Sequence, residues 1–430
     1  MANMGDTGVL IVGGGPAGLM AAIAAAQNGA DVIVLERNET TASASPRLAL
    51  KLRITGKGRC NLTNTAPLDE LIANVPVNGR FLFGAFSRFG SADTMDFFES
   101  LCVPLKAERG GRVFPCSDNA HDAADALVRK AKQLGVKFVT GRAQKLIIEE
   151  GRAVGVVTET GEALRANAVI VATGGRSYPK TGSTGDGYRL AEQAGHGITP
   201  IKPSLVPLEC HENFCAKLMG LSLKNTALEV WDTQEFRVIY KGFGELLFTH
   251  FGVSGPMALS ASSHMRDMQS GRYELQLDLK PALRPEQLDA RILRDFAAAP
   301  NKNFINALNS LLPKSLVPVI VHLSGVPAGL RVNQVTREQR QSLIEILKCL
   351  RLTVTGFRPI DEAIITSGGV CTNEIDPGTM QSKRLPGLFF AGEVIDCDAY
   401  TGGFNLQIAW STGHAAGTSA AAPLLNTIAN

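Results

Sequence analysis

The sequence is notable first for what it lacks. Its eight cysteines form no Cys-x-x-Cys pair and no Cys/His ligand spacing, which disfavours a zinc or iron–sulfur site. An excess of one charge is also missing, because Lys+Arg 43 against Asp+Glu 40 leaves a net charge of +3. A net charge this small does not by itself indicate that the chain binds nucleic acid. The longest apolar helix candidate, Ala17–Ala26, is shorter than the roughly 20 residues that span a bilayer.

The remaining bulk properties are those of an ordinary globular protein. The hydrophobic fraction is 45% and the charged fraction 19%, and 430 residues suffice for two or three domains with a large core. The opening letters MANMGDTG show no signal-peptide pattern. We therefore expect a cytoplasmic protein with reduced thiols, no metal centre and no membrane association.

One interval near the N-terminus has no acidic residue at all. Between Glu39 and Asp69 there is no Asp or Glu, and the basic residues in that interval are Arg47, Lys51, Arg53, Lys57 and Arg59. The stretch ITGKGRCNLTN, residues 54–64, lies inside it. Its glycines and basic side chains predict a loop that binds an anion, although an anion alone does not account for the cysteine in its middle.

The first 37 residues have the pattern of a strand, a helix and a second strand. Val9–Val12 is a short apolar run that ends in glycines, and Pro16–Gln27 is rich in alanine with one apolar face. Asn28 and Gly29 end that helix, and Asp31–Glu36 is the second strand. The sequence therefore predicts a βαβ unit.

A glycine motif connects the first strand to the helix. Gly13 permits the tight turn, Gly15 lets a pyrophosphate approach the backbone, and Gly18 allows close packing of the helix on the strand. Glu36, at the end of the second strand, is placed to accept hydrogen bonds from a ribose. An unrelated glycine-rich turn is the alternative. The residues predicted to bind a dinucleotide here are Gly13, Gly15, Pro16, Ala17, Gly18, Glu36 and Arg37.

The pattern of polar and apolar residues changes twice further along the chain. Short alternating segments such as TALEVW and YELQLDL predict a β-rich insertion after about residue 200, and several short helices follow. The expected organisation is one α/β domain interrupted by a β-barrel-like insertion and a helical insertion. The expected boundaries are 1–198 and 359–430 for the first, 199–284 plus about 351–358 for the second, and 285–350 for the third.

Two further glycine-rich elements favour FAD over a nicotinamide as the dinucleotide. One follows the strand Ala168–Thr173, and the other is GLFFAGEVIDCDAYTGGFNLQ, whose helix N-terminus is suited to an anionic reduced flavin. No second dinucleotide motif appears between 190 and 390, so a separate NAD(P)H domain is not expected. Asp186 is expected to be the N-cap of the next helix. The predicted cofactor residues are Thr173, Gly174, Gly175, Gly392, Glu393, Gly403, Asn405 and Leu406.

These elements carry a resemblance to known flavoproteins. ITGKGRCNLTN, GELLFTHFGVSGP and TMQSKRLPGLFFAGEVIDCDAYTGGFNLQIAWSTGHAAG resemble the YhiN/BaiN family of NAD(P)/FAD-dependent oxidoreductases, in the fumarate reductase-like branch of the two-dinucleotide-binding-domain flavoproteins. The likeness extends from Val9 to Gly417. It implies a Rossmann-like FAD-binding domain interrupted by a six-stranded β-barrel-like domain and a small helical domain. It also implies non-covalent FAD, with NAD(P)H as electron donor. It also implies that residues 56–64 run beside the FAD pyrophosphate toward the flavin.

The resemblance assigns roles to several side chains. It implies that Gly56, Gly58, Arg59 and Cys60 contact the cofactor. Arg59, Asn61 and Arg112 are the candidate substrate contacts. The candidate catalytic residues are His250, because histidine is a common proton donor in enzymes, and Cys60. A small buried filler remains the alternative for Cys60, and a structural histidine bonded to a carbonyl remains the alternative for His250.

The predicted function is hydride transfer from flavin N5 to a polarised C=C bond. The candidate substrate is a uridine in large-subunit ribosomal RNA, which would give dihydrouridine. A small-molecule flavoenzyme, either a bile-acid intermediate reductase or an aminoacetone-type amine oxidase, is one alternative. A non-catalytic flavin-dependent sensor or RNA-binding protein is another. For RNA, the deciding observation is whether the basic side chains of residues 47–59 form a solvent-facing groove. The oligomeric state is left open.

Overall fold

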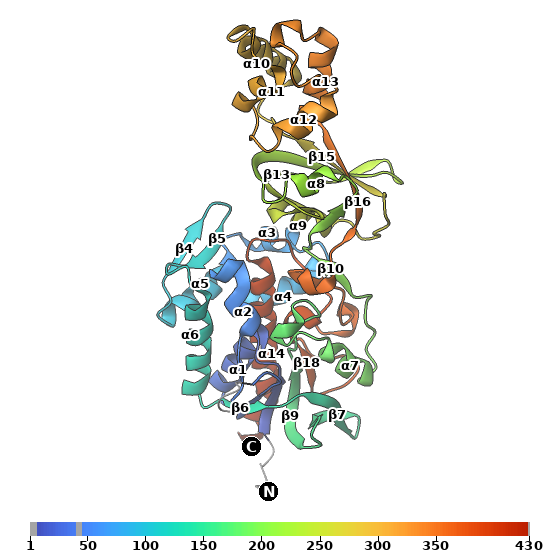
Figure 1. Ribbon diagram of the computed structural model, residues 1–430. Coiled ribbons are helices and arrows are strands. Elements are labelled where there is room, and N and C mark those ends of the chain that lie inside the picture. The colour runs from blue at the N-terminus through green and yellow to red at the C-terminus, as the bar shows by residue number, and fades with distance from the viewer. Residues whose placement is uncertain (1–6, 40–44, 429–430) are drawn as a thin grey trace. The chain divides into compact units, whose positions relative to one another are not determined.

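The computed structural model describes residues 7–39 and 45–428. The chain folds into two compact units (Figure 1). The first, here called the α/β unit, contains the residues up to Ser204 and those from Ala363 onward. The second, the barrel unit, is Leu205–Glu362.

The α/β unit is built on a seven-stranded sheet. Its order is β6-β2-β1-β9-β8-β7, and β18 also pairs with β9. Strands β1, β2, β6, β9 and β18 are parallel, whereas β7 and β8 join as an antiparallel extension. The strands are β1 Thr7–Val12, β2 Val32–Glu36, β6 Lys137–Thr140, β7 Ala143–Glu149, β8 Arg152–Thr158, β9 Ala163–Val171 and β18 Leu388–Phe390.

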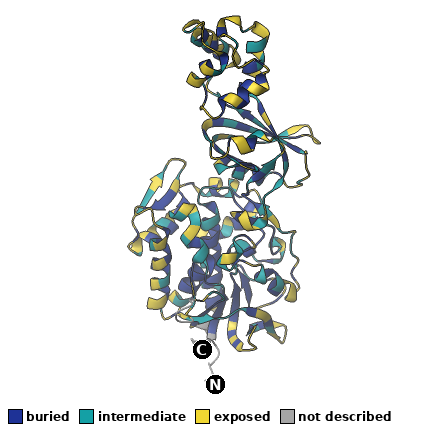
Figure 2. Ribbon diagram, in the orientation of Figure 1, coloured by how far each residue is buried: buried dark blue, intermediate teal, exposed yellow. Residues whose placement is uncertain are grey.

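The parallel part of the sheet is fully covered, as apolar strands of this type require. Every residue of β2 is buried, and Figure 2 shows the centre of the unit in the colour of buried residues. The helices of the unit are α1 Pro16–Gln27, α2 Leu50–Ile54, α3 Leu68–Ala73, α4 Phe83–Arg88, α5 Ser91–Ser100, α6 Ala120–Gln133, α7 Asp186–Gln193 and α14 Phe404–Ile428.

Helices α1 and α14 lie in direct contact because small residues line both of them. A Cβ atom added to Gly413 would stand 2.5 Å from the Ala17 carbonyl oxygen, and one added to Gly417 would stand 2.2 Å from that of Ala21. Trp410 on α14 is fully buried, and its indole N–H donates to the Leu62 carbonyl at 2.9 Å. The C-terminal helix is therefore part of the core and fixes the segment around Leu62.

Two smaller sheets complete the α/β unit. A three-stranded sheet has the order β3-β5-β4, and a two-stranded antiparallel sheet pairs β10 with β17. The strands are β3 Thr63–Asn64, β4 Leu105–Glu108, β5 Arg112–Pro115, β10 Lys202–Ser204 and β17 Ile365–Ser367.

The barrel unit contains a closed barrel of order β11-β14-β13-β12-β15-β16. Alternate residues of its strands, such as Leu228, Val230, Leu275 and Leu277, are fully buried, so the barrel interior is a packed core. The strands are β11 Leu208–Cys210, β12 Ser222–Asp232, β13 Arg237–Thr249, β14 Gly252–Ser254, β15 Tyr273–Asp278 and β16 Leu350–Phe357.

The helices of the barrel unit share that core. Leu288 on α10 and Leu343 on α13 belong to the same buried cluster as the barrel strands. The helices are α8 Phe214–Lys217, α9 Gly255–Ser262, α10 Pro285–Ala297, α11 Phe304–Ala307, α12 Val317–Ser324 and α13 Arg337–Lys348. Within residues 7–39 and 45–428, no helix has the length and apolar character to cross a membrane.

The predicted fold class is confirmed, and so are the elements of the βαβ unit. Some predicted bounds differ from the observed ones: the strand expected at Ala168–Thr173 begins at Ala163 and ends at Val171. The three-stranded sheet was not predicted, because its strands are short and alternate little between polar and apolar residues.

Candidate functional site

The three glycines of the motif at the start of α1, two in the turn after β1 and one in the helix, have different surroundings. A Cβ atom at Gly13 would lie 2.5 Å from the Ala172 carbonyl oxygen, and one at Gly18 would lie 1.9 Å from the Gly13 carbonyl oxygen. Both glycines are therefore required by packing. A Cβ atom at Gly15 would meet no atom within 4 Å. Of the three, Gly15 alone faces open space.

That open space lies at the N-terminus of α1. Gly15 is the N-cap, Pro16 occupies the first turn, and no side chain caps the helix. The first N–H groups of a helix have no partner within the helix and carry partial positive charge, so they are suited to a phosphate. Beside the turn, Thr173 has a buried hydroxyl with no hydrogen-bond partner among the described residues. These features fit the pyrophosphate of a dinucleotide.

Glu36 lies at the end of β2, as a ribose-binding acid in this fold does. It is 6% exposed, and its carboxylate already accepts three bonds: from the Gly14 N–H at 2.8 Å, the Asn38 N–H at 2.9 Å and the Asn38 amide at 2.7 Å. Burial raises the pKa of Glu36 against the effect of these donors. A carboxylate has roughly four acceptor positions, so about one remains for a ligand.

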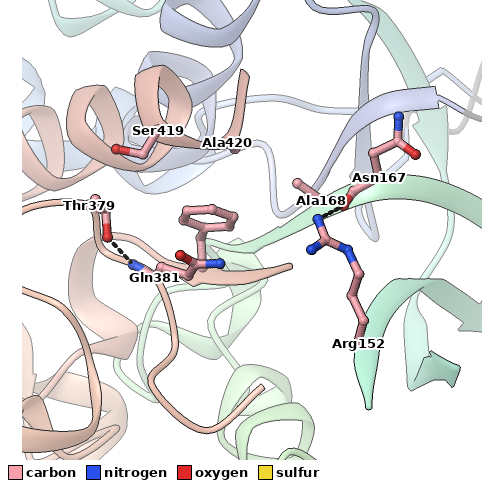
Figure 3. A pocket seen from close by; sticks show the side chains of 8 residues that line it. Arg152, Asn167, Ala168, Thr379, Gln381, Ser419 and Ala420 are labelled. Atoms are coloured by element: carbon pink, nitrogen blue, oxygen red, sulfur yellow. Dashed lines mark hydrogen bonds between the residues drawn. The ribbon is translucent and has the colours of Figure 1, made fainter. Parts of the chain in front are cut away.

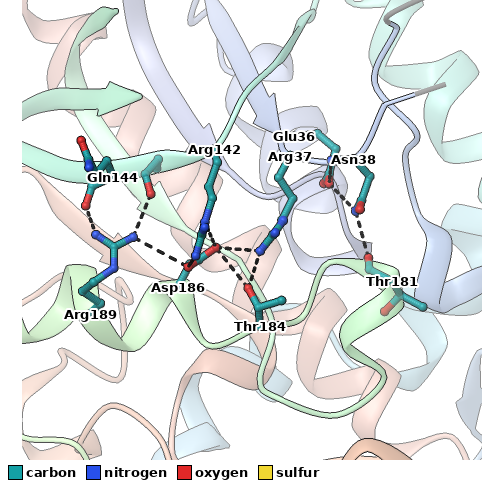
Figure 4. A network of polar contacts seen from close by, with 10 residues as sticks. Glu36, Arg37, Asn38, Arg142, Gln144, Thr181, Thr184, Asp186 and Arg189 are labelled. Atoms are coloured by element: carbon teal, nitrogen blue, oxygen red, sulfur yellow. Dashed lines mark hydrogen bonds and ion pairs between the residues drawn. The ribbon is translucent and has the colours of Figure 1, made fainter. Parts of the chain in front are cut away.

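Asp186 is the centre of a charge network at the same edge of the sheet (Figure 4). Its carboxylate pairs with Arg37 at 2.9 Å and with Arg142 at 2.6 Å. Although burial acts to raise it, the bonds from Arg142 and the charge of Arg37 hold the pKa of Asp186 below its usual value. The expectation that Asp186 caps α7 is wrong, because Gly185 is the N-cap and Asp186 is the first helical residue. Arg37 is thus bonded to protein.

The loop that follows α2 has an unusual backbone. Gly56, Lys57, Gly58 and Cys60 have φ values of 59°, 60°, 85° and 61°, all in the left-handed region. A Cβ atom at Gly58 would meet nothing within 4 Å, whereas one at Gly56 would lie 3.1 Å from the Asn61 nitrogen. One glycine of the pair therefore faces open space, and the other lies close to the backbone of Asn61.

Cys60 points into the core. It is 0% exposed and belongs to the large apolar cluster of the α/β unit. Burial raises the pKa of its thiol to about 12, against a hydrogen bond with Thr55. This environment resembles that of a buried filler and makes the thiol a weak acid at neutral pH.

The three residues predicted to contact substrate lie near β5. Arg59 forms ion pairs with Glu108 and Asp118, both at 2.5 Å, and its guanidinium lies 4.2 Å from the centre of the Phe114 ring. Arg112 lies 3.9 Å from Glu108. The charge of Arg59 is therefore balanced by acidic residues that follow it by 49 and 59 positions.

Asn61 connects two of the motifs on which the resemblance rests. With its amide nitrogen toward the carbonyls of Val113 (3.2 Å) and Thr63 (3.1 Å), its oxygen accepts from the Gly403 N–H at 2.9 Å. Its polar atoms are thus used by the protein itself.

Glu393 is also bound by protein groups. Its carboxylate lies 2.6 Å from the Lys51 ammonium and 3.1 Å from the Ser177 hydroxyl, and it accepts from the Thr366 N–H at 2.9 Å. A Cβ atom at Gly175 would lie 2.3 Å from the Thr366 hydroxyl and 2.7 Å from the Glu393 carboxylate. Gly175 therefore makes room for this network.

The sequence analysis did not include Lys51, Ser177 or Thr366 among the cofactor residues. Lys51 is one of the basic residues in the acid-free interval, and Thr366 precedes a glycine pair. Neither signal tells which acidic residue a side chain will meet. Glu393 lies 342 positions from Lys51, so only the folded chain brings them together.

Glycines also allow close packing at the other predicted cofactor positions. A Cβ atom at Gly392 would lie 2.7 Å from the Ala17 Cβ, one at Gly174 would lie 2.8 Å from the Ser183 hydroxyl, and one at Gly403 would lie 2.2 Å from the Thr63 carbonyl oxygen.

Asn405 and Leu406 lie in the first turn of α14, which begins at Phe404. Asn405 closes the preceding loop, since its amide accepts from the Ala399 N–H at 2.9 Å and donates to the Ala399 carbonyl at 2.8 Å. Leu406 is partly buried against the large core cluster.

The basic side chains of residues 47–59 do not form one continuous basic surface. Lys51 and Arg59 are paired as described, and Arg53 pairs with Asp125 at 2.7 Å. Arg47 and Arg53 line a cavity of about 650 Å³ with His121 and Lys132. Much of the positive charge that the sequence concentrates in this interval is therefore neutralised by acidic residues from elsewhere.

A second, smaller cavity contains none of the predicted site residues. It has a volume of about 100 Å³, and Figure 3 shows Arg152 at its edge donating to the Asn167 carbonyl at 2.9 Å. It therefore adds nothing to the candidate site.

His250 lies in the barrel unit, in the two-residue turn between β13 and β14. It is exposed, and its ring contacts Phe251 with the ring centres 5.0 Å apart. Its imidazole makes no hydrogen bond with any residue in the described part of the chain, so the carbonyl-bonded alternative is not what the structure shows.

Comparison with known proteins agrees with this geometry. The family model described as HI0933-like protein Rossmann domain matches residues 7–419. The chain belongs to this family. This chain is 32% identical to the 3-dehydro-bile acid delta(4,6)-reductase of Clostridium scindens, over 96% of this chain and 98% of that one. It is 30% identical to the ribosomal RNA dihydrouridine synthase of Escherichia coli, over 94% and 95%.

A solved structure agrees in fold. The 3-ketosteroid-delta4-(5alpha)-dehydrogenase of Rhodococcus jostii superposes with a TM-score of 0.54 at 18% identity, covering 97% of each chain. The chain is thus a member of a family of FAD-dependent oxidoreductases and has the FAD-binding Rossmann fold, as the resemblance implied.

Proposed function

We propose that this protein reduces a conjugated carbon–carbon double bond, with a uridine of large-subunit ribosomal RNA as the first candidate substrate. The main support is that two near full-length relatives, each at least 30% identical, have names that specify such chemistry. One forms dihydrouridine in ribosomal RNA, and the other is a delta(4,6)-reductase of a bile acid. The shared step is the addition of a hydride and a proton across a polarised double bond.

The open turn at Gly15 supports the binding of FAD in the α/β unit. We assign the pyrophosphate to the N–H groups at the start of α1 and the ribose to Glu36. The loop at Gly58, which also faces open space, is assigned to the same cofactor. When bound, FAD supplies a hydride carrier, which NAD(P)H reduces.

We assign the proton to His250 rather than to Cys60. His250 is exposed and makes no hydrogen bond with described residues, so its imidazole is available to a substrate. Cys60 is buried with a raised pKa, and a weak acid away from solvent is poorly suited to donate a proton at neutral pH.

A small enone is the second candidate substrate. It is favoured by the ion pairs of Lys51, Arg53 and Arg59, which reduce the positive charge available to an RNA backbone. The cavity beside Arg47 retains some basic character and is the part of this interval that favours RNA.

Complementation tests the substrate. The chain is expressed in Escherichia coli that lacks its own ribosomal RNA dihydrouridine synthase, and nucleosides of the large-subunit RNA are measured by mass spectrometry. Return of dihydrouridine with the wild-type chain, but not with Gly15→Val, supports the RNA substrate. If dihydrouridine stays absent while the purified protein reduces steroid enones with NAD(P)H, the second candidate holds.

His250→Gln tests the proton donor. We expect normal FAD content and normal reduction of the flavin by NAD(P)H, with reoxidation by the alkene slowed roughly 10²–10⁴-fold, the usual value of a positioned acid. Stopped-flow absorbance separates the two half-reactions. Unchanged reoxidation would remove His250 from the mechanism.

A further inference from the structure

The large cavity of the α/β unit is lined by none of the residues assigned to FAD or to the proton. Its volume of about 650 Å³ lies within the range of roughly 300–1,000 Å³ that small-molecule pockets have. Its walls come from residues 45–53, from helix α6 and from the start of β6. Helices α2 and α6 are neighbours at this place (Figure 1).

The protein itself neutralises only part of the positive charge in this cavity. Arg53 pairs with Asp125 at 2.7 Å, whereas Arg47 and Lys132 are exposed and pair with no acidic group in the described part of the chain. The described residues that line the cavity include no Asp or Glu. Two positive charges therefore remain, and a phosphate monoester carries a charge of about −1.5 to −2 near neutral pH. A carboxylate would match only one of them.

Arg53 and His121 also offer a hydrogen-bond donor. The Arg53 guanidinium lies 2.9 Å from His121 Nδ1, and a guanidinium can only donate. Nδ1 is therefore the acceptor, and the neutral ring carries its proton on Nε2, where this bond does not use it. The backbone N–H of His121 donates to the Asn119 side chain at 3.1 Å, which holds the residue at the start of α6.

The rest of the cavity wall is apolar. Phe138 is partly buried and presents an aromatic ring, and such rings stack on nucleobases of any kind. The apolar residues of the wall are Pro46, Leu48, Leu50, Val128, Val136 and Phe138. A ligand that fits this cavity therefore combines an apolar or aromatic body with a doubly charged anion.

The wall is fixed by backbone hydrogen bonds. The Arg47 N–H donates to the Asn38 carbonyl at 2.8 Å, and the Ala49 N–H donates to the Gly14 carbonyl at 2.9 Å. The segment that carries Arg47 and Leu48 is thus tied to the end of β2 and to the glycine turn. Little ordering is needed when a ligand binds, which favours affinity.

We propose that this cavity binds a nucleoside phosphate, with the phosphate on the basic side chains and the base against the apolar wall. The charge of the cavity favours a free mononucleotide, and an RNA strand, whose internal phosphates carry one charge each, is the other source of the same chemistry. The proposal does not depend on the reduction proposed above, because binding is measured directly and without turnover.

Titration calorimetry on the flavin-loaded protein tests the proposal with AMP. We expect saturable binding, with adenosine and inorganic phosphate each bound about tenfold more weakly or worse, because each lacks one part of the contacts. Flavin absorbance is followed in the same titration. If AMP binds only as flavin is released, it occupies the dinucleotide turn and the proposal is wrong.

Three substitutions locate the binding. Arg47→Ala and Lys132→Ala should each weaken AMP binding about tenfold, because each removes a cation from the phosphate. Arg129→Ala is the matched control, since Arg129 is exposed on the same helix and does not line the cavity. Its effect should stay below about twofold. Because all three side chains are exposed, each variant should fold. Absence of saturable AMP binding, or equal effects of Lys132→Ala and Arg129→Ala, would overturn the proposal.

A short oligoadenylate with a 5′-hydroxyl end separates the two sources. Weaker binding than AMP identifies a free nucleotide as the ligand, and tighter binding identifies an RNA strand. In both cases Lys132→Ala should weaken the tighter of the two ligands about tenfold. If that ligand binds Lys132→Ala as well as wild type, it binds elsewhere on the protein and the cavity is not its site.

Discussion

The turns before α1 and α14 are both rich in glycine, yet they use it differently. At Gly15 the missing side chain leaves open space in front of a helix N-terminus, whereas at Gly403 the space is filled by the Thr63 carbonyl, 2.2 Å from where a Cβ would stand. Gly15 has an ordinary φ of −81°, but Gly403 has a φ of 101°. A glycine-rich turn therefore indicates that some group lies close to the backbone. The sequence does not show whether that group belongs to a ligand or to the protein itself.

The largest effect on stability should come from a substitution in the turn before α14, where the protein fills the space beside Gly403. Gly403→Ala places a Cβ against backbone and forces a left-handed conformation, so we expect a loss of about 3 kcal/mol or more in the free energy of unfolding of the apo-protein. Urea denaturation followed by circular dichroism measures it. A change below about 1 kcal/mol would mean that the Thr63 contact relaxes easily.

The open turn should behave in the opposite way. Gly15→Val leaves the apo-protein within about 1 kcal/mol of wild type, because no atom lies within 4 Å of the added Cβ. FAD binding should weaken roughly 100-fold or more, equivalent to about 3 kcal/mol of lost phosphate contacts. Flavin fluorescence titration checks this. Retained stoichiometric flavin in Gly15→Val would contradict the assignment of the pyrophosphate to this turn.

Two lysines of the acid-free interval also differ in whether the protein itself contacts them. Lys51 is largely buried on Glu393, whereas Lys57 is exposed and pairs with no described residue. Lys51→Met should cost about 1–3 kcal/mol of apo-protein stability, because it leaves a partly buried carboxylate without its cation. Lys57→Met is the matched control and should stay within about 0.5 kcal/mol. Equal effects in thermal unfolding would show that the Lys51–Glu393 pair contributes nothing.

The smallest effect should be at Cys60. Cys60→Ser keeps a side chain of similar size. With a thiol pKa of about 12, the side chain that is replaced is only a weak acid at neutral pH. We expect FAD to be retained and both half-reactions to stay within about tenfold of wild type, well below the effect of removing a positioned acid. A selective loss of the oxidative half-reaction in stopped-flow measurements would make Cys60 the proton donor.

The sequence alone determined the elements whose signals are local. The βαβ unit follows from apolar periodicity and the spacing of Gly13, Gly15 and Gly18, and the structure has it at nearly the predicted bounds. The fold class followed from the same signals together with the resemblance of the motifs.

Only the tertiary structure decided which polar groups are left for a ligand. The sequence places Arg59, Asn61 and Glu393 in motifs, but their partners Glu108, Gly403 and Lys51 lie 49, 342 and 342 positions away, respectively. Likewise, only the fold shows that Gly15 faces open space while Gly403 meets backbone. Local patterns determine helices and turns because those depend on near neighbours. Ion pairs and packing depend on residues that the chain brings together only when it folds.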